Sequence, residues 1–324
     1  MIDGYLFAYF AGEDTADGEQ VRFGLSRGAD PLHYDDLHGA GPVLVSTLGE
    51  GGVRDPFLVR APGGDRCYLI ATDLRIHPDG DWAAAVRTGS RSIVVWESTD
   101  LVSWSAPRLV EVSPQTAGCT WAPEAVWDDE HGEFFVFWAS TLYDPADAGH
   151  DGDSHHRMMY ATTTDFVTFS PARVWSDPGY SVIDSTLVRH DGWWYRFTKD
   201  ERDPSSSSPT SKFITAERSR DLRSTAYEPV TDGIGRTTDL GPGVEHGEGP
   251  VVVPSPTGDG WYLLVDEFGG RGYVPFESPV LDAAQWAPSA SFRMPTGARH
   301  GSVLPVTRDE HDALRQALGS GTTP

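Results

Sequence analysis

The stretch Gly51-Gly52-Val53-Arg54-Asp55-Pro56-Phe57-Leu58-Val59-Arg60 sets the pattern that organises this 324-residue chain. An acidic residue stands at the mouth of a short apolar run, and a Gly-containing turn at 62–64 leads to a second apolar run at 67–72. Short apolar runs bounded by turn residues are typical of paired strands. The stretch therefore predicts a strand that presents a carboxylate where it starts.

The same design returns four more times along the chain. The copies lie at 122–127, 182–188, 247–253 and 299–305, and their ionisable residues are Glu124, Asp184, Glu248 and His300. Successive copies are about 50–70 residues apart, which is the period of a propeller blade and not of a helical repeat. Because these residues stand at a similar point of each copy, we expect them to share one site.

The segments between the copies indicate four-stranded units. Each first strand is followed by two further strands, a turn of the Ser-x-Asp-Leu-x-x-Trp type (98–104 is one example) and a short edge strand, as in a propeller blade. The last unit is incomplete, since only the strand at 302–306 and a short helix at 311–318 follow His300.

The N-terminal fifty residues contain the strands that this last unit lacks. We therefore predict an all-β, five-bladed β-propeller whose fifth blade is closed by the N-terminal strands, which also removes bare strand edges. The expected division is one propeller domain over 1–310 and a short C-terminal helix and tail over 311–324. A β-sandwich, or a pair of β domains, is the alternative.

Composition narrows the class of partner. The 35 Gly, 24 Pro and 11% aromatic residues suit many short strands. A net charge of −23 argues against nucleic acid and anionic membrane surfaces as partners. The two cysteines, Cys67 and Cys119, provide neither a disulfide framework nor a Cys-based zinc site. No apolar run approaches the roughly 18 residues of a membrane span.

The N-terminal residues 1–5 lack the basic region and hydrophobic core of a signal peptide. The expected location is therefore the cytoplasm, or outside the cell if the signal peptide is absent from this sequence.

The expectation of acid–base chemistry rests on three carboxylates. The inner strands of a propeller converge on its axis, so Asp55, Asp184 and Glu248 would surround one funnel. Crowded carboxylates split their pKa values, which leaves one protonated and another ionised at neutral pH. An acid and a base in one pocket are what glycoside hydrolysis needs. A turn role for Asp55 before Pro56, and a strand cap at Asp184, are the structural alternatives.

Four motifs in order add a family resemblance. They are Arg54-Asp55-Pro56, Thr120-Trp121-Ala122-Pro123-Glu124, Ile183-Asp184-Ser185 and Gly247-Glu248-Gly249-Pro250. Together, over nearly the whole chain, they resemble glycoside hydrolase family 43, the five-bladed propeller arabinofuranosidases and xylosidases. The resemblance implies an inverting enzyme with 1–310 as its catalytic domain. It also implies Asp55 as general base, Asp184 as the carboxylate that tunes and orients the acid, and Glu248 as general acid.

The same resemblance assigns further residues. It implies that Trp121 lines the sugar subsite. Glu124 stands where the family more commonly has Asp in this motif. In the family's galactan-cleaving branch, which lacks the usual base, a Glu in the second blade can take part in catalysis. Because Asp55 is present here, Glu124 is expected to be a substrate contact. Independently of the resemblance, the positive charge of Arg299 leads us to expect that it pairs with the acidic cluster and contacts substrate, with an ordinary surface arginine as the alternative. His300 is a candidate ligand for Ca²⁺ near the axis, with an ordinary hydrogen-bonded histidine as the alternative. No cofactor is expected for the chemistry itself.

The function that this resemblance implies is release of a terminal pentose by an exo-acting hydrolase. It favours α-L-arabinofuranose from arabinose-containing glycans, with β-xylosidase as the second candidate and β-1,3-galactosidase behind it. A non-catalytic carbohydrate-binding propeller is the candidate of another class. Long insertions at 74–91, 143–156 and 200–211 favour a closed pocket and hence exo cleavage.

Overall fold

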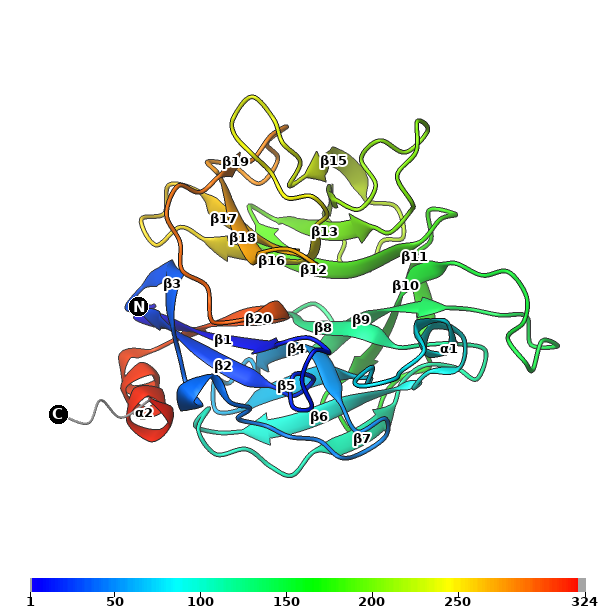
Figure 1. Ribbon diagram of the computed structural model, residues 1–324, viewed down its shortest axis with the longest axis horizontal. Coiled ribbons are helices and arrows are strands. Elements are labelled where there is room, and N and C mark those ends of the chain that lie inside the picture. Colours follow the sequence, from blue (N-terminus) through cyan, green and yellow to red (C-terminus); the bar gives the residue numbers. More distant parts are fainter. Residues whose placement is uncertain (1, 320–324) are drawn as a thin grey trace.

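The computed structural model describes residues 2–319 and consists of five four-stranded antiparallel sheets around a common axis (Figure 1). The predicted all-β, five-bladed propeller is thereby confirmed. The strands of blades 1 and 2 are β4 (Val53–Arg60), β5 (Cys67–Asp73), β6 (Ser92–Ser98) and β7 (Arg108–Glu111), then β8 (Trp121–Asp128), β9 (Glu133–Thr141), β10 (His156–Thr163) and β11 (Arg173–Ser176). Those of blades 3 and 4 are β12 (Val182–His190), β13 (Trp193–Asp200), β14 (Ile214–Ser219) and β15 (Glu228–Ile234), then β16 (Glu248–Pro254), β17 (Trp261–Glu267), β18 (Gly272–Ser278) and β19 (Ala287–Pro288).

Blade 5 joins the two ends of the chain, as predicted. Its strands, from the axis outward, are β20 (Arg299–Val306), β1 (Gly4–Phe10), β2 (Arg22–Arg27) and β3 (Asp30–Asp36). The register of β1 on β20 sets Gly4 opposite Val306 and Ala8 opposite Ser302. In Figure 1 the blue N-terminal strands lie beside the late-sequence strand β20. This pairing closes the ring and gives β20 the strand partner that it would otherwise lack.

The interior strands read as continuous apolar runs because neighbouring blades cover them on both faces. All seven residues of β1 are buried, and so are all seven of β5. The large side chains Trp96, Trp138 and Trp175 are fully buried between blades. Each such side chain contributes about 1.5–3 kcal/mol relative to exposure, so the packing between blades stabilises the ring.

The turns between third and fourth strands follow the predicted Ser-x-Asp-Leu pattern. In blade 1 the Asp100 carboxylate accepts hydrogen bonds from the backbone N–H groups of Val102 (2.9 Å) and Ser103 (2.7 Å). Asp165 makes the equivalent pair of bonds in blade 2. An Asp side chain that satisfies N–H groups two and three residues on fixes a tight turn, which explains why the motif recurs in the sequence.

Three short helical segments complete the described chain. Helix α1 (Trp82–Thr88) falls in the 74–91 insertion, where only a loop was expected, and Asp81 caps it by accepting from Ala83 N at 2.8 Å. The 3₁₀ segment η1 spans His38–Ala40. Within residues 2–319, no helix has the length and apolar character needed to cross a membrane.

The predicted C-terminal helix is present as α2 (Arg308–Leu318), and it begins at Arg308 because a Thr307–Glu310 capping box starts it there. Leu314 of α2 is fully buried and joins the hydrophobic cluster that contains Leu6 and Leu304 of blade 5. The expected division at residue 310 stays a prediction, and positions 320–324 of the expected tail lie outside the described residues.

Candidate active site

Each inner strand carries a β-bulge near its start. The register is interrupted in all five blades at the same point, and the bulged positions are Asp55, Ala122, Asp184, Gly249 and His300. The first four adopt left-handed backbone conformations, with φ between 48° and 53°. Bulges bend a strand and re-aim the side chain at the bulge. The repeat therefore turns equivalent residues of the blades toward one another around the axis.

Aligning the bulges corrects the expected equivalence of the four acidic residues. Asp55 and Asp184 occupy the bulge, but Glu248 precedes the bulge at Gly249 and Glu124 lies two residues after the one at Ala122. Because the bulge inserts a residue and side chains alternate along a strand, a position two residues on belongs to the next layer along the axis.

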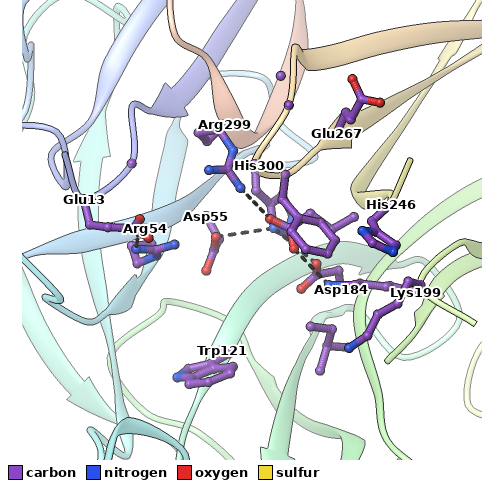
Figure 2. Close-up of a pocket in the computed structure, with 18 of the residues that line it drawn as sticks. Glu13, Arg54, Asp55, Trp121, Asp184, Lys199, His246, Glu267, Arg299 and His300 are labelled. Carbon is purple, nitrogen blue, oxygen red and sulfur yellow. Dashed lines mark hydrogen bonds and ion pairs between the residues drawn. The ribbon is translucent and has the colours of Figure 1, made fainter. Parts of the chain in front are cut away.

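A cavity of about 1060 Å³ opens over the inner strands (Figure 2). All five blades contribute to it through the bulge or the residue before it: Arg54, Asp55, Trp121, Ile183, Asp184, Glu248, Arg299 and His300 line it. Trp82, His156 and Glu201, from the three long insertions or their ends, line it too. The structure thus brings the three predicted catalytic carboxylates, Trp121, Arg299 and His300 into one cavity.

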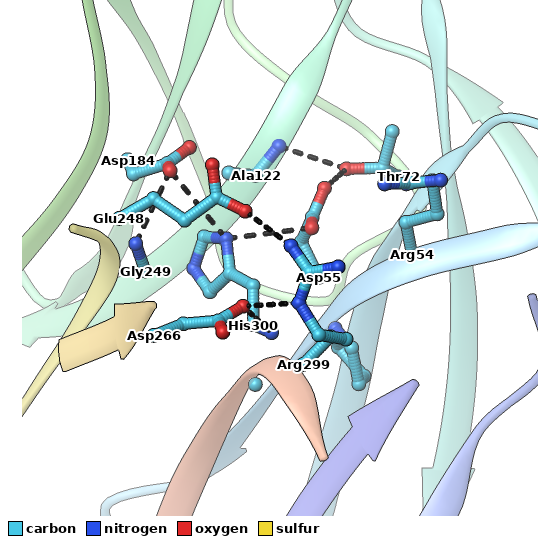
Figure 3. A network of polar contacts seen from close by, with 12 residues as sticks. Arg54, Asp55, Thr72, Ala122, Asp184, Glu248, Gly249, Asp266, Arg299 and His300 are labelled. Atoms are coloured by element: carbon cyan, nitrogen blue, oxygen red, sulfur yellow. Dashed lines mark hydrogen bonds and ion pairs between the residues drawn. The ribbon is translucent and has the colours of Figure 1, made fainter. Parts of the chain in front are cut away.

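Asp55 is held by neighbours on both oxygens (Figure 3). Thr72 Oγ1 donates to Asp55 Oδ2 at 2.7 Å and itself accepts from Ala122 N at 2.8 Å, while His300 Nδ1 lies 3.4 Å from Asp55 Oδ1. Burial raises the pKa of the Asp55 carboxyl, but the hydrogen bond and charge of His300 outweigh it and the net pKa is lowered. Asp55 is therefore ionised at neutral pH.

His300 lies between two carboxylates rather than among metal ligands. Its Nδ1 is 3.4 Å from Asp55 and 3.8 Å from Asp184. Burial alone would lower the pKa of the imidazole, but these two carboxylates raise it to about 10. Among residues 2–319 no group of three or more His, Cys, Asp or Glu side chains is placed to hold a metal. The expected role of His300 as a Ca²⁺ ligand therefore stays a prediction.

Asp184 differs from Asp55 in its proton affinity. Its Oδ2 accepts from Gly249 N at 3.2 Å, and burial raises its pKa to about 6, against the attraction of His300. Gly249 is required here, because a Cβ at this position would lie 2.7 Å from the His300 ring. The two bulge carboxylates thus differ in proton affinity within one cavity.

Glu248 is paired with two cations. Lys199 Nζ donates to its Oε2 at 2.9 Å, and Arg299 Nη2 donates to its Oε1 at 2.8 Å. Arg299 Nε also donates to Asp266 Oδ2 at 2.8 Å. Burial raises the pKa of Glu248, but Lys199 and Arg299 outweigh it, so the net pKa is lowered. Without substrate, the Glu248 carboxylate is ionised.

Comparison with known proteins decides the family. A family model described as a probable glycosyl hydrolase domain, of the family-43-related type, matches residues 1–312. The chain belongs to the family-43-related glycosyl hydrolases. The resemblance inferred from the four motifs is thereby confirmed.

Individual relatives of this glycosyl hydrolase are similar over most of the chain. The alpha-L-arabinofuranosidase of Bifidobacterium longum subsp. longum is 32% identical over 295 residues, which cover 84% of this chain and 28% of that protein. The chain thus spans little more than a quarter of the length of this relative. A thermostable family-43 glycoside hydrolase aligns with a TM-score of 0.53 and 18% identity, over 77% of this chain and 75% of the other. The alpha-L-arabinofuranosidase from Lactobacillus brevis gives a TM-score of 0.50 and 16% identity, over 74% and 72%. The two structures share the fold.

The sequence reading of this glycosyl hydrolase missed three residues that hold the candidate catalytic groups. They are Thr72, Lys199 and Asp266, on the second strands of blades 1, 3 and 4. Each lies opposite the residue that precedes the bulge of its blade. Each begins a polar pair that ends an apolar run: Thr72-Asp73, Lys199-Asp200 and Asp266-Glu267. That recurrence is the signal that could have identified them.

Glu124 lies apart from the other predicted site residues of this glycosyl hydrolase. It is 4% exposed, does not line the cavity, and its Oε2 has no hydrogen-bond partner among the described residues. Burial raises its pKa to about 8. The structure therefore places Glu124 in the layer beyond the carboxylates and not beside the space that a sugar would fill.

Trp121 forms an aromatic wall of the cavity. Its ring stacks on His156 with centroids 5.2 Å apart and meets Trp82 edge-on at 6.1 Å. These neighbours, one from β10 and one from α1, fix the plane of the indole. The wall offers a large apolar face next to the carboxylates.

Proposed function

We propose that this glycosyl hydrolase releases terminal α-L-arabinofuranosyl groups from arabinose-containing glycans with inversion of configuration. The observation that carries the proposal is the joint placement of an ionised Asp55, Asp184 and Glu248 around one cavity. The 32% identity to an alpha-L-arabinofuranosidase supports the choice of sugar. Insertion residues such as Trp82 and Glu201, which line the cavity, support exo cleavage.

Asp55 is the general base of the proposal. An ionised carboxylate fixed by Thr72 and His300 can accept a proton from water as the water attacks the anomeric carbon. His300, carrying a positive charge, keeps Asp55 ionised, while burial leaves Asp184 with a raised pKa of about 6. Trp121 supplies the face against which the C–H side of the released sugar packs.

Glu248 is the general acid of the proposal and donates a proton to the glycosidic oxygen. Since Lys199 and Arg299 hold it ionised without substrate, substrate entry must weaken one of these ion pairs as Glu248 takes up a proton. The nearby charge of Asp184 opposes that of Glu248 and favours the protonated acid. Arg299 therefore pairs with Glu248 before substrate arrives, and it can contact substrate only when this ion pair is released. No step passes through Ca²⁺.

A substrate panel with product analysis tests this function. We expect turnover of arabinofuranosides and arabino-oligosaccharides, with β-arabinofuranose as the first product seen by proton NMR. Release of xylose instead would move the assignment to β-xylosidase, and release of galactose to β-1,3-galactosidase. Binding of sugars without turnover of any substrate would favour a carbohydrate-binding propeller and overturn the proposal.

Lys199→Met is expected to move the alkaline limb of the kcat/KM profile on arabinobiose to higher pH. The acid must be protonated, and its lowered pKa makes activity fall early as pH rises. Removing Lys199 removes one cause of that lowered pKa, so the protonated fraction of Glu248 persists to higher pH. The measurement is kcat/KM against pH for both proteins. Arg218→Met is the control, because Arg218 pairs with Asp282 and does not line the cavity. An unmoved limb in Lys199→Met would contradict Glu248 as the acid.

A further inference from the structure

A second aromatic wall of the cavity takes no part in the chemistry above. Phe268 follows β17 and His246 precedes β16, so both belong to blade 4, and both line the cavity. Their rings stack with centroids 5.6 Å apart and planes 21° from parallel. In Figure 2 His246 lies beside Lys199, on the side of Asp184 that faces away from Arg54.

This wall packs against Lys199, the residue that pairs with the proposed acid. Lys199 Nζ lies 4.4 Å from the centroid of the Phe268 ring, and the same Nζ donates to Glu248 Oε2 at 2.9 Å. The acid of a glycosidase protonates the oxygen of the leaving group. The leaving group must therefore pass on the side of Glu248, where Phe268 provides an aromatic face.

The wall is held in place before substrate arrives. The Glu267 carboxylate, only 7% exposed as a residue, accepts from Glu245 N at 2.8 Å and from Arg271 Nε at 2.6 Å. Arg271 Nη2 also donates to Gly243 O at 2.9 Å. These bonds tie the segment before β16 to the turn after β17, so the two rings need little ordering on binding.

Polar groups line the same cavity near this wall. Lys199 also lies 2.8 Å from Glu201, which in turn pairs with Lys212 at 2.8 Å. Both Glu201 and Lys212 line the cavity. An aromatic face combined with charged hydrogen-bonding groups suits a sugar ring, whose C–H face is apolar and whose edge carries hydroxyl groups.

We propose that Phe268 and His246 bind the sugar of the leaving group, so that the substrate is a pentose attached to another sugar rather than to a small non-carbohydrate group. The inference rests on the proposed function for the position of the acid. It adds the residues that recognise the sugar attached to the released pentose.

Two substrates with the same arabinosyl group test it. Arabinobiose places a sugar beyond the cleaved bond, whereas arabinofuranosyl fluoride places a single atom there. We expect Phe268→Ala to lower the ratio of kcat/KM on arabinobiose to kcat/KM on the fluoride by about 5- to 50-fold, mainly through KM, since a stacked face is lost. Phe268→Tyr keeps the ring and is expected to keep most of the ratio. His246→Ala should lower the ratio in the same direction.

The controls separate this role from a structural one. Phe292→Ala removes a 38%-exposed Phe that does not line the cavity and should leave the ratio at its wild-type value. Thermal unfolding confirms that each variant folds, and His246→Ala decides the matter should Phe268→Ala fail to fold. A fall on arabinobiose that lies in kcat and moves the alkaline limb of the pH profile would overturn the proposal, because Phe268 would then act only through Lys199 and Glu248. An equal fall on both substrates would overturn it too, because losing a contact with the leaving-group sugar cannot affect the fluoride. No change on either substrate would overturn it as well.

A binding measurement keeps the inference distinct from the proposed function. If the wild type hydrolyses neither substrate, the proposed function fails, and saturation-transfer NMR with arabinobiose and xylobiose then decides about the wall. Weaker disaccharide binding in Phe268→Ala, with unchanged binding of the monosaccharides, would support it. Disaccharide binding that is absent in the wild type, or unaffected by the substitution, would overturn it.

Discussion

Asp55→Asn is expected to lower kcat/KM on arabino-oligosaccharides by roughly 10²–10⁴-fold, the usual loss for a positioned base. Asparagine has the same shape but cannot accept the proton of the attacking water. It also tolerates the left-handed backbone at this position, where φ is 51°, better than most residues do. The Thr72 hydroxyl can still donate to the amide oxygen, so the fold should be kept while the chemistry is lost.

The matched control for Asp55→Asn is Asp191→Asn. Asp191 has a φ of 49° and a side chain that is 84% exposed, so it tests the same substitution in the same backbone conformation away from the cavity. Azide adds a positive test. Asp55→Gly, which suits the positive φ, leaves space for azide, a nucleophile that needs no base. We expect azide to restore turnover of arabinofuranosyl fluoride in Asp55→Gly and to yield an inverted glycosyl azide. Full activity of Asp55→Asn would contradict Asp55 as the base.

The sequence sufficed for the fold because the blade period is a local pattern. Five apolar runs with the same flanking turns indicated five inner strands, and the unpaired strand after His300 required partners that only the N-terminus could supply. Helix α1 was not predicted. A seven-residue segment is marginal as an isolated helix, and this one depends on tertiary anchoring: Glu19 binds the backbone N–H groups of Ile76 and His77 just before it.

The candidate site was predicted in its carboxylates and missed in their supports. Asp55 and Asp184 were predicted because each stands at the start of a repeated strand, and the structure places both at equivalent bulges. The bulge itself adds a residue that the linear pattern does not reveal, and so Glu124 was placed one layer too close to the cavity. Lys199 and Asp266 were missed because their relation to Glu248 arises only in the folded chain. Lys199 reaches Glu248 from the neighbouring blade, whereas Asp266 lies opposite Glu248 on the next strand and shares Arg299 with it.

Glu248→Gln is expected to lower kcat/KM on arabinobiose by roughly 10²–10⁴-fold, or about 2.7–5.4 kcal/mol of transition-state stabilisation. Glutamine cannot protonate the leaving oxygen. The cations beside it keep other partners, since Lys199 also pairs with Glu201 and Arg299 with Asp266, so the variant should fold. The loss should be much smaller on arabinofuranosyl fluoride, whose leaving group needs little protonation.

This dependence on the leaving group distinguishes Glu248 from its competitor. Asp184, with a pKa near 6, holds a proton more readily than Glu248 when no substrate is bound. If Asp184 were the donor, Asp184→Asn would show the large loss on arabinobiose and the small loss on the fluoride, and Glu248→Gln would lower both alike. Glu217→Gln is the matched control, because Glu217 pairs with the buried Arg196 outside the cavity and should leave both rates near wild type. The ion pairs of Glu248 are then what substrate must loosen: the acid becomes competent only when a glycosidic oxygen reaches it.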